Sequence, residues 1–348
     1  MNRADPMVLN RKFIQFPAPS VAILELTNRC NHGCVHCVRE SPAYYAADDM
    51  TEEHWHRVLD ELAAIKTFAV CFTGGEATTF PGLLPLIRHA RRLRMCVSLK
   101  SNGILLQRLA LQLADAGVGH MDVSLYGATA ATHERCTRIA GSFEKTIEGI
   151  KAVRAKKIPV SLSVTLFRWN VHELEAMRAL AGELDCSVKR DYFLMNSDLG
   201  RNLDGDFLTP EQIRLVEARW PGATLPSSQN GTGGIKICAQ GMNTLAVTAR
   251  GEILTCVTIR KPIGHVRREG LIETWQSLHA REEGSHPIPH DVEYDRFSRC
   301  SGCQYVTRCH TCLGHSHAAT GMFHEPPLER CLVTMALYGS KPGPYEAL

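Results

Sequence analysis

Fourteen cysteines in 348 residues are the side chains of this chain best suited to unusual chemistry. Three lie in the run Cys30-Asn-His-Gly-Cys34-Val-His-Cys37, and seven more lie between residues 238 and 331. No apolar stretch of signal-peptide length opens the chain, so we expect a cytoplasmic protein, in which clustered thiols bind metals more often than they form disulfides. The other four cysteines are expected to be small buried hydrophobes: Cys71, Cys96, Cys136 and Cys186.

The first cysteine run follows a predicted strand directly, so its three thiolates would share one loop. Three thiolates leave one iron of a 4Fe-4S cluster without a protein ligand, and that iron can bind and reduce a small molecule. A zinc site completed by His32 or His36 is the structural alternative.

The second cysteine region has the pattern Cys238-x12-Gly251-x4-Cys256, then Cys300-x2-Cys303-x5-Cys309-x2-Cys312, and finally Cys331. Seven thiols are too many for one zinc ribbon and too few for two sites that each bind four thiolates. One site would therefore lack a protein thiolate. The alternative is a pair of zinc sites that only stabilise a small fold.

The elements that must position these residues follow an alternating pattern of short β-type runs and longer helical runs, which predicts parallel strands joined by right-handed crossovers. Six such units predict an α/β fold, a partial (β/α)6 TIM-type barrel with functional loops at the carboxyl ends of its strands. The strands are expected at 21–27, 68–73, 95–100, 120–126, 159–166 and 186–194, and the helices at 51–66, 82–93, 105–117, 142–156, 170–184 and 210–219.

Four regions follow from this pattern. Residues 1–19 form an N-terminal extension, 20–200 the barrel, 201–234 a connector rich in Gly, Pro, Ser and Asn, and 235–348 a small domain held together by metal rather than by its own core. The net charge is only +3, which gives no reason to expect nucleic acid or a membrane surface as partner.

The CxxxCxxC loop after strand one resembles the radical S-adenosylmethionine (SAM) superfamily, although His36 replaces the usual aromatic residue. The resemblance implies a 5′-deoxyadenosyl radical, made from SAM, that abstracts a hydrogen atom. Further matching segments are Thr73-Gly-Gly-Glu76-Ala77, where proline commonly follows the glutamate, and Met121-Asp-Val-Ser-Leu-Tyr126, where relatives often carry aspartate at the last position.

These matches imply a set of SAM contacts. Gly74, Gly75 and Glu76 would hold the methionine amino group, and Ser101, Asn102 and Ser124 would line the ribose and carboxylate. Arg135 or Arg138 would pair with the carboxylate, although a solvated arginine at a helix entry is an equal alternative. Weaker candidates are Thr165 and Asn170.

Residues 235–335 resemble the SPASM extension of peptide-modifying radical SAM enzymes, which implies two auxiliary 4Fe-4S clusters and three clusters in all. Carried over, the family pattern gives the distal cluster Cys300, Cys303, Cys309 and Cys331, and gives the cluster nearer the barrel Cys238, Cys256 and Cys312. The fourth ligand of the nearer cluster stays open between His310, Gln240, Asp191, water and substrate.

The resemblance implies oxidative modification of a ribosomally made precursor peptide, such as a crosslink. Val257, after Cys256, replaces the aspartate of sulfatase-activating relatives, and Leu313-Gly-His315 offers little to tetrapyrrole carboxylates. The alternative is a small-molecule dehydrogenase or decarboxylase of cofactor or haem biosynthesis. Expected partners are the peptide, a separate peptide-recognition protein if the enzyme surface does not bind the leader, and an electron donor such as flavodoxin or ferredoxin.

Overall fold

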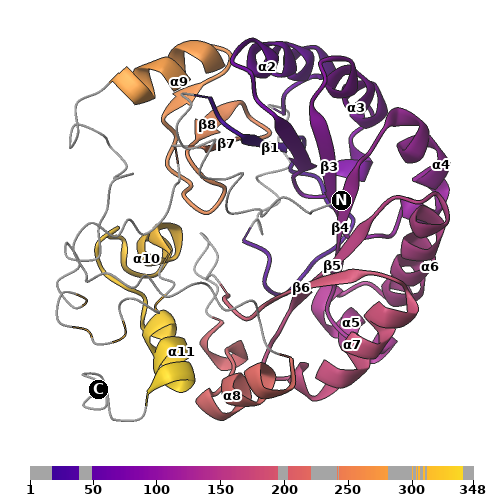
Figure 1. Ribbon diagram of the computed structural model, residues 1–348, viewed down its shortest axis with the longest axis vertical. Helices are drawn as coiled ribbons and strands as arrows, with labels where there is room; N and C mark the ends of the chain where they lie inside the picture. Colours follow the sequence, from indigo (N-terminus) through magenta and orange to yellow (C-terminus); the bar gives the residue numbers. More distant parts are fainter. Residues whose placement is uncertain are drawn as a thin grey trace, which may run out of the picture.

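The computed structural model describes residues 18–38, 49–194, 203–220, 241, 243–280, 300, 303, 305, 309 and 312–339. A single nine-stranded sheet has the strand order β6-β5-β4-β3-β2-β1-β7-β8-β9. Its first six strands are parallel neighbours in chain order, and the sheet curves with helices on its outer face (Figure 1). They are β1 (Val21–Glu25), β2 (Ala69–Thr73), β3 (Cys96–Ser101), β4 (His120–Leu125), β5 (Val160–Thr165) and β6 (Ser187–Asp191). The predicted α/β partial barrel is confirmed.

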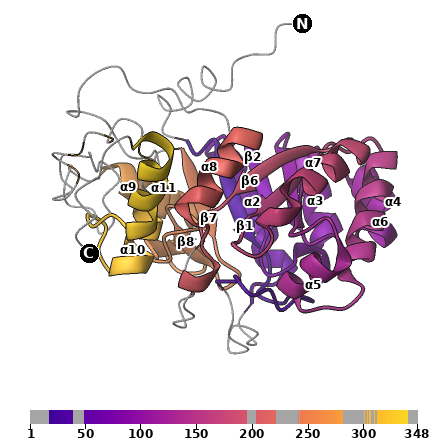
Figure 2. The ribbon, with the colours of Figure 1, turned by 90° about the horizontal axis from the view of Figure 1, so that it is seen from below.

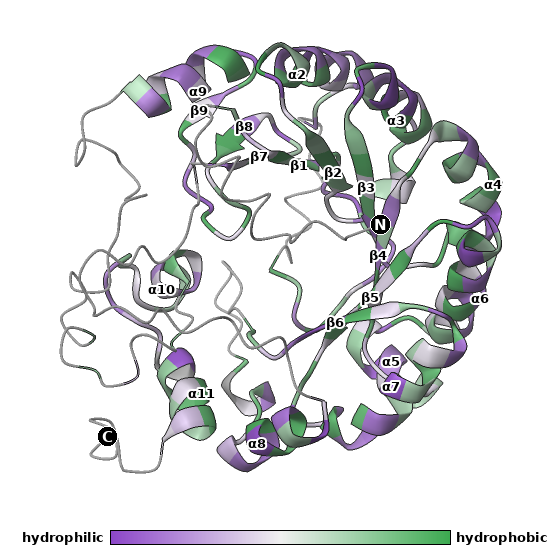
Figure 3. Ribbon diagram, viewed as in Figure 1, coloured by the Kyte–Doolittle hydropathy of each residue, from purple (hydrophilic) through white to green (hydrophobic). Residues whose placement is uncertain are grey.

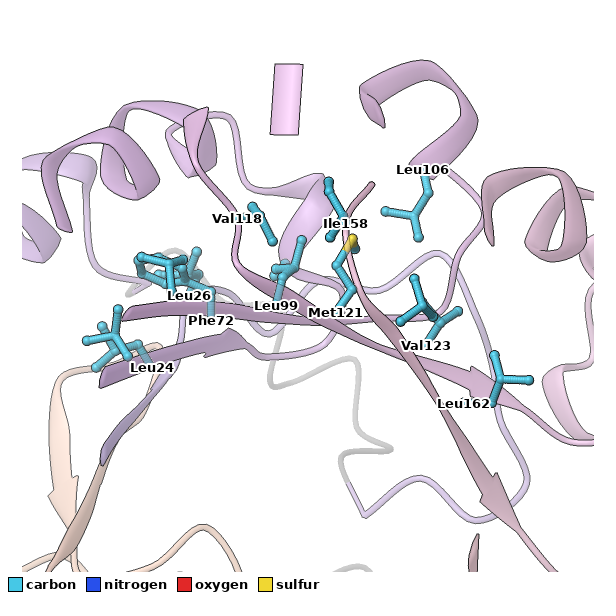
Figure 4. Close-up of a cluster of buried hydrophobic side chains, with 14 of the residues drawn as sticks. Leu24, Leu26, Phe72, Leu99, Leu106, Val118, Met121, Val123, Ile158 and Leu162 are labelled. Atoms are coloured by element: carbon cyan, nitrogen blue, oxygen red, sulfur yellow. The ribbon is translucent and has the colours of Figure 1, made fainter. Parts of the chain in front are cut away.

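Alternation along β3, β4 and β5 separates an apolar outer face from a mainly polar inner face, as the period of two requires. Leu24, Phe72, Leu99, Val123 and Leu162 are fully buried and point toward the helices (Figure 4). Burial of one such side chain stabilises the fold by about 1.5–3 kcal/mol, so this layer fixes the register of the sheet. The intervening residues point into the barrel.

The crossover helices form where the sequence predicts them. The helix after β1 begins with a capping box, in which Thr51 Oγ1 accepts from His54 N and the Thr51 N–H donates to His54 Nδ1 (3.2 Å). The helix after β3 ends at Gly117, whose φ of 97° suits glycine. The crossover and following helices are α2 (Glu52–Ala64), α3 (Leu83–Arg92), α4 (Leu106–Ala116), α6 (Ser142–Ala155), α7 (Leu174–Glu183) and α8 (Pro210–Arg219).

A short helix, α5 (Ala130–Thr137), is an element that the sequence pattern does not predict as a helix. Its eight residues are too few to show a periodic apolar stripe. Tertiary contacts stabilise it instead: Thr129 caps it, and the Glu173 carboxylate accepts from the backbone of Ala128 and from the hydroxyl of Thr132. This helix matters because its C-terminal end contacts the first cysteine loop.

The C-terminal region continues the barrel sheet. Strand β7 (Thr244–Val247) pairs in parallel with β1, and β8 (Glu252–Leu254) and β9 (Gly264–His265) follow as antiparallel strands. Leu245, Val247 and Trp275 belong to the same hydrophobic core as the barrel residues, so this part of the region packs on the barrel. The remaining helices are α9 (Leu271–Ala280), α10 (Leu313–Thr320) and α11 (Leu328–Tyr338).

Helices α9 and α11 pack against helices of the barrel, and α10 contacts the loop after β8 through Gly314 and Thr258. Helix α9 contacts α2 (Figure 1), and α11 contacts α8 (Figure 2). The helices around the rim alternate hydrophilic and hydrophobic residues (Figure 3). None of the helices in the described ranges is both long and apolar enough to cross a membrane. Short 3-10 turns lie at Ala77–Thr79, Val171–Glu173 and Asp204–Asp206.

Candidate functional site

The first cysteine loop leaves the carboxyl end of β1 and is held in place by the end of α5. The N–H of Gly33 donates to the carbonyl of Thr137 (3.0 Å), and the N–H of Val35 donates to the carbonyl of Cys136 (2.9 Å). These bonds satisfy orphan carbonyls of a helix C-terminus and fix the loop at the same time. The loop presents three half-buried thiols: Cys30, Cys34 and Cys37.

The environment of these thiols suits thiolate ligands. A side-chain hydrogen bond from Cys136, against the opposing effect of burial and with help from His32, lowers the pKa of Cys34 to about 4. Burial raises the pKa of Cys30 to about 11, yet its sulfur accepts from the His32 N–H (3.4 Å) and lies 4.0 Å from Asn102 Nδ2. Such N–H donors stabilise cluster-bound sulfur.

The three thiols are not arranged for a single ion. In the part of the chain that the structure describes, no three Cys, His, Asp or Glu side chains converge on one metal ion. A 4Fe-4S cluster needs no such convergence, because each thiolate binds a different iron. The donor set and the N–H donors around it therefore fit an iron–sulfur cluster.

Cys136 is a residue whose position the sequence did not reveal. It is fully buried, as expected for a small hydrophobe. Its thiol, however, donates a hydrogen bond to the sulfur of Cys34 and lies 3.4 Å from His36 Nδ1. This contact joins residues about a hundred positions apart, and nothing in the spacing of the cysteines marks it. Cys136 is a neighbour of the cysteine loop, not only a core residue.

Aromatic rings surround His36, the residue that departs from the family pattern. Its ring meets Tyr126 and Phe167 edge-on, at centroid distances of 5.0 and 5.3 Å. Phe167 stacks on Trp169, and the guanidinium of Arg135 lies over the Trp169 ring at 4.5 Å. Arg135 thus has a partner within the protein.

The predicted SAM residues on β2 and β3 meet around the carboxylate of Glu76, which is 1% exposed. Oε1 accepts from the N–H and hydroxyl of Thr78 (3.0 and 2.5 Å) and from the hydroxyl of Ser101 (2.9 Å). Oε2 accepts from the N–H of Asn102 (2.7 Å). A carboxylate offers about four acceptor positions, two on each oxygen. Oε2 accepts from one donor, so its second position can take a further donor such as an ammonium group.

Gly74 and Gly75 allow the β2 loop to touch the cysteine loop. A Cβ on Gly74, whose φ is +136°, would lie 2.4 Å from the carbonyl oxygen of Thr27, and one on Gly75 would lie 2.3 Å from that of Arg29. The N–H of Gly75 donates to Thr27 O (2.7 Å) and that of Glu76 to Arg29 O (2.8 Å). These glycines therefore hold the two predicted functional loops together.

The remaining barrel candidates lie at the ends of β4 and β5. Ser124 is half-buried on the inner face of β4, and Arg138 is the left-handed residue that ends α5. Asn170, fully buried, donates from Nδ2 to the carbonyls of Tyr126 and Thr165, each at 2.9 Å. Asn170 thus ties these strand ends together, and the SAM role of Thr165 stays a prediction.

Several of the C-terminal cysteines that the structure describes lie close to one another. Thr258 Oγ1 lies 3.2 Å from the sulfur of Cys256 and 4.0 Å from that of Cys312, so these two thiols are near neighbours. Burial, together with the nearby thiols of Cys309, Cys331 and Cys303, raises the pKa of Cys300 to about 12. Cys238, with Gln240 and His310 as candidate fourth ligands, lies outside the described residues.

Comparison with protein families assigns two segments. Residues 24–181 match the family described as the Radical SAM superfamily, and residues 238–312 match the SPASM family, described as an iron-sulfur cluster-binding domain. The first match contains the cysteine loop and the Glu76 network, and the second runs from Cys238 to Cys312.

Two curated relatives differ in name and in coverage. An AdoMet-dependent heme synthase of Methanosarcina barkeri is 26% identical, over 88% of this chain and 95% of the synthase. A PqqA peptide cyclase of Rhodopseudomonas palustris is 33% identical, over 49% of this chain, and the match spans only 45% of the cyclase. The chain thus spans about half of the cyclase it resembles.

A solved structure shares the fold. SuiB of Streptococcus suis bound to precursor peptide SuiA superposes with a TM-score of 0.63 at 12% identity, over 93% of this chain and 78% of SuiB. At this identity the likeness concerns the fold alone.

Proposed function

Because the chain belongs to the radical SAM superfamily and carries a SPASM domain, we propose that it modifies a ribosomally made peptide oxidatively, with one catalytic and two auxiliary 4Fe-4S clusters. Cys30, Cys34 and Cys37 would hold a 4Fe-4S cluster, which would supply the electron needed to release a 5′-deoxyadenosyl radical from SAM. The observation that carries the proposal is the contact of that loop with the Glu76 network through Thr27 and Arg29.

The chain's own residues position the reactants. Cys30, Cys34 and Cys37 would bind three irons and leave the fourth open. The remaining acceptor position of Glu76 would take the SAM ammonium group, and the glycine contacts would keep that position at a constant distance from the loop. Cys256 and Cys312, with Cys238, would hold the auxiliary cluster nearer the barrel.

The peptide assignment rests on the PqqA peptide cyclase of Rhodopseudomonas palustris, whose identity of 33% is higher than that of the heme synthase but covers half of the chain. Val257 stands after Cys256, where a sulfatase-activating enzyme would need a general base. A crosslink, which removes two hydrogen atoms from the peptide, is the reaction that we favour.

A second candidate function is a tetrapyrrole reaction of haem biosynthesis. The specific observation in its favour is coverage, since the heme synthase of Methanosarcina barkeri matches over 95% of its length. Against it, Gly314 packs on Thr258 with no room for a Cβ, so position 314, two residues after Cys312, can carry no basic side chain.

Cluster content and radical formation test the first part of the proposal. Anaerobically reconstituted protein should bind about 12 Fe per chain, as three 4Fe-4S clusters require. Cys34→Ala should abolish 5′-deoxyadenosine formation from SAM and dithionite, whereas Cys186→Ala, a matched change away from the loop, should not. Bound zinc with little iron, or undiminished product in Cys34→Ala, would refute the assignment.

Substrate type is tested separately. The enzyme is incubated with SAM, reductant and a short peptide encoded beside its gene, and in parallel with an iron-loaded coproporphyrin. We expect the peptide mass to fall by two hydrogen atoms while the porphyrin is unchanged. Turnover of the porphyrin alone would establish the second candidate function.

A further inference from the structure

The inner face of the barrel sheet is polar at mid-depth. In closed barrels of this type the interior is filled mainly by branched aliphatic side chains. Here the side chains that alternate with the helix-facing Leu99, Met121 and Leu162 are polar instead. They come from four adjacent strands: Ser98, Lys100, His120, Asp122, Ser161, Ser187 and Lys189.

Asp122 organises this face. Its side chain is 10% exposed, and its Oδ1 lies 2.5 Å from the ammonium nitrogen of Lys189 and 3.3 Å from His120 Nε2. The ammonium nitrogen of Lys100 lies 3.8 Å from Oδ2. Burial raises the pKa of Asp122, but Lys189 and Lys100 outweigh that effect and lower it, so the group is a carboxylate.

One carboxylate therefore faces two ammonium groups. The side chains of Lys100, on β3, and Lys189, on the edge strand β6, are 50% and 59% exposed, so solutes can reach them. Other charges on the inner face are already bonded: Glu25 pairs with Arg260 (3.0 and 3.1 Å), and Asp191 Oδ1 accepts from the N–H of Phe193 (2.9 Å). The two ammonium groups thus share the single carboxylate of Asp122.

We propose that Lys100 and Lys189 bind a carboxylate group of the substrate. Lys100 lies near the carboxyl end of β3, where Ser101 and Asn102 donate to Glu76, so the bound carboxylate would lie inside the barrel toward the strand ends that hold the proposed SAM site. Asp122 holds both amines in place, and the carboxylate completes an alternating set of charges. The inference deepens the proposed function and rests on it: the substrate would be an acidic peptide, with a tetrapyrrole acid chain as the other source of the same group.

The experiment measures protection of the lysines in anaerobic holoenzyme. An amine-acylating reagent is applied, and acylation rates of single lysines are read by mass spectrometry. The probes are N-acetylglutamate α-methylamide, its neutral glutamine isostere, and coproporphyrin III. Lys151, an exposed lysine on α6, is the reference site. Because no turnover is involved, the result does not depend on radical formation or on the reaction proposed above.

The glutamate probe should slow acylation of Lys100 and Lys189 by about threefold at twice its dissociation constant, with Lys151 unaffected. The glutamine isostere should protect neither. Lys189→Gln should raise the dissociation constant of the glutamate probe, read from protection of Lys100, by about tenfold or more, since one charged contact is lost, and Lys151→Gln should not.

Equal protection by the glutamine isostere, or no protection by either acid, overturns the inference. Tighter protection by coproporphyrin III than by the glutamate probe supports the carboxylate site and favours the second candidate function over the peptide. If Lys189→Gln does not fold, the wild-type comparison of the glutamate and glutamine probes decides alone.

Discussion

The carboxylate of Glu76 should stabilise the barrel as well as serve SAM, because four donors from two loops converge on it. In Glu76→Gln the amide oxygen can keep the three donors of Oε1, but the amide NH2 then faces the N–H of Asn102, which donates to Oε2 at 2.7 Å. One charge-assisted hydrogen bond is lost and two donors oppose each other in a buried site.

A hydrogen bond to a charged group contributes about 1.5–3 kcal/mol, so we expect Glu76→Gln to lower the free energy of unfolding by roughly 2–3 kcal/mol. For a unit of 150–250 residues this corresponds to a fall in Tm of roughly 4–12 °C. The assay is thermal unfolding of the anaerobic, cluster-loaded protein, followed by circular dichroism, together with SAM binding by equilibrium dialysis.

The matched control is Glu183→Gln, an exposed glutamate at the end of α7, whose effect should stay within about 0.5 kcal/mol. A Tm for Glu76→Gln equal to that of the control would refute the structural reasoning. A lower Tm with unchanged SAM affinity would instead contradict the role of Glu76 toward the ammonium group.

Two further outcomes follow from the loops. Gly75→Ala should prevent stable assembly of the cysteine loop, because its Cβ would lie 2.3 Å from Arg29 O, and the result should be a lower iron content and a lower Tm. Gly182→Ala, with open space around the new Cβ, should change neither quantity. Equal iron content and equal Tm in the two variants would contradict this reasoning. Burial raises the pKa of Glu173, but hydrogen bonds from Thr132, Thr129 and Ala128 outweigh that effect and lower it. The ionised Glu173 carboxylate therefore stabilises the fold at pH 7, and this contribution is lost as the pH falls below about 4.3. Glu173→Gln should therefore have a lower Tm than wild type at pH 7, with the gap narrowing in acid; a gap that does not change with pH would disprove the carboxylate's role.

Local chain spacing was enough to predict much of this protein. The thiols of the first loop are separated by three and two residues, so their shared position after β1 follows from connectivity alone. The alternation of short apolar runs with helical runs likewise predicted the parallel strands and their outer helices, because each period reflects local backbone geometry. The ligand roles of the cysteines and the SAM contacts stay predictions.

Only the tertiary structure decided which distant residues meet. Cys136 reaches Cys34, and Lys189 reaches Asp122 across 67 positions, because the curved sheet brings separate crossover units together. Likewise, β7 pairs with β1 and joins the C-terminal region to the barrel core. No local pattern encodes these contacts, since their partners are chosen by how the whole sheet curves and packs, and they determine the surroundings in which the predicted residues would act.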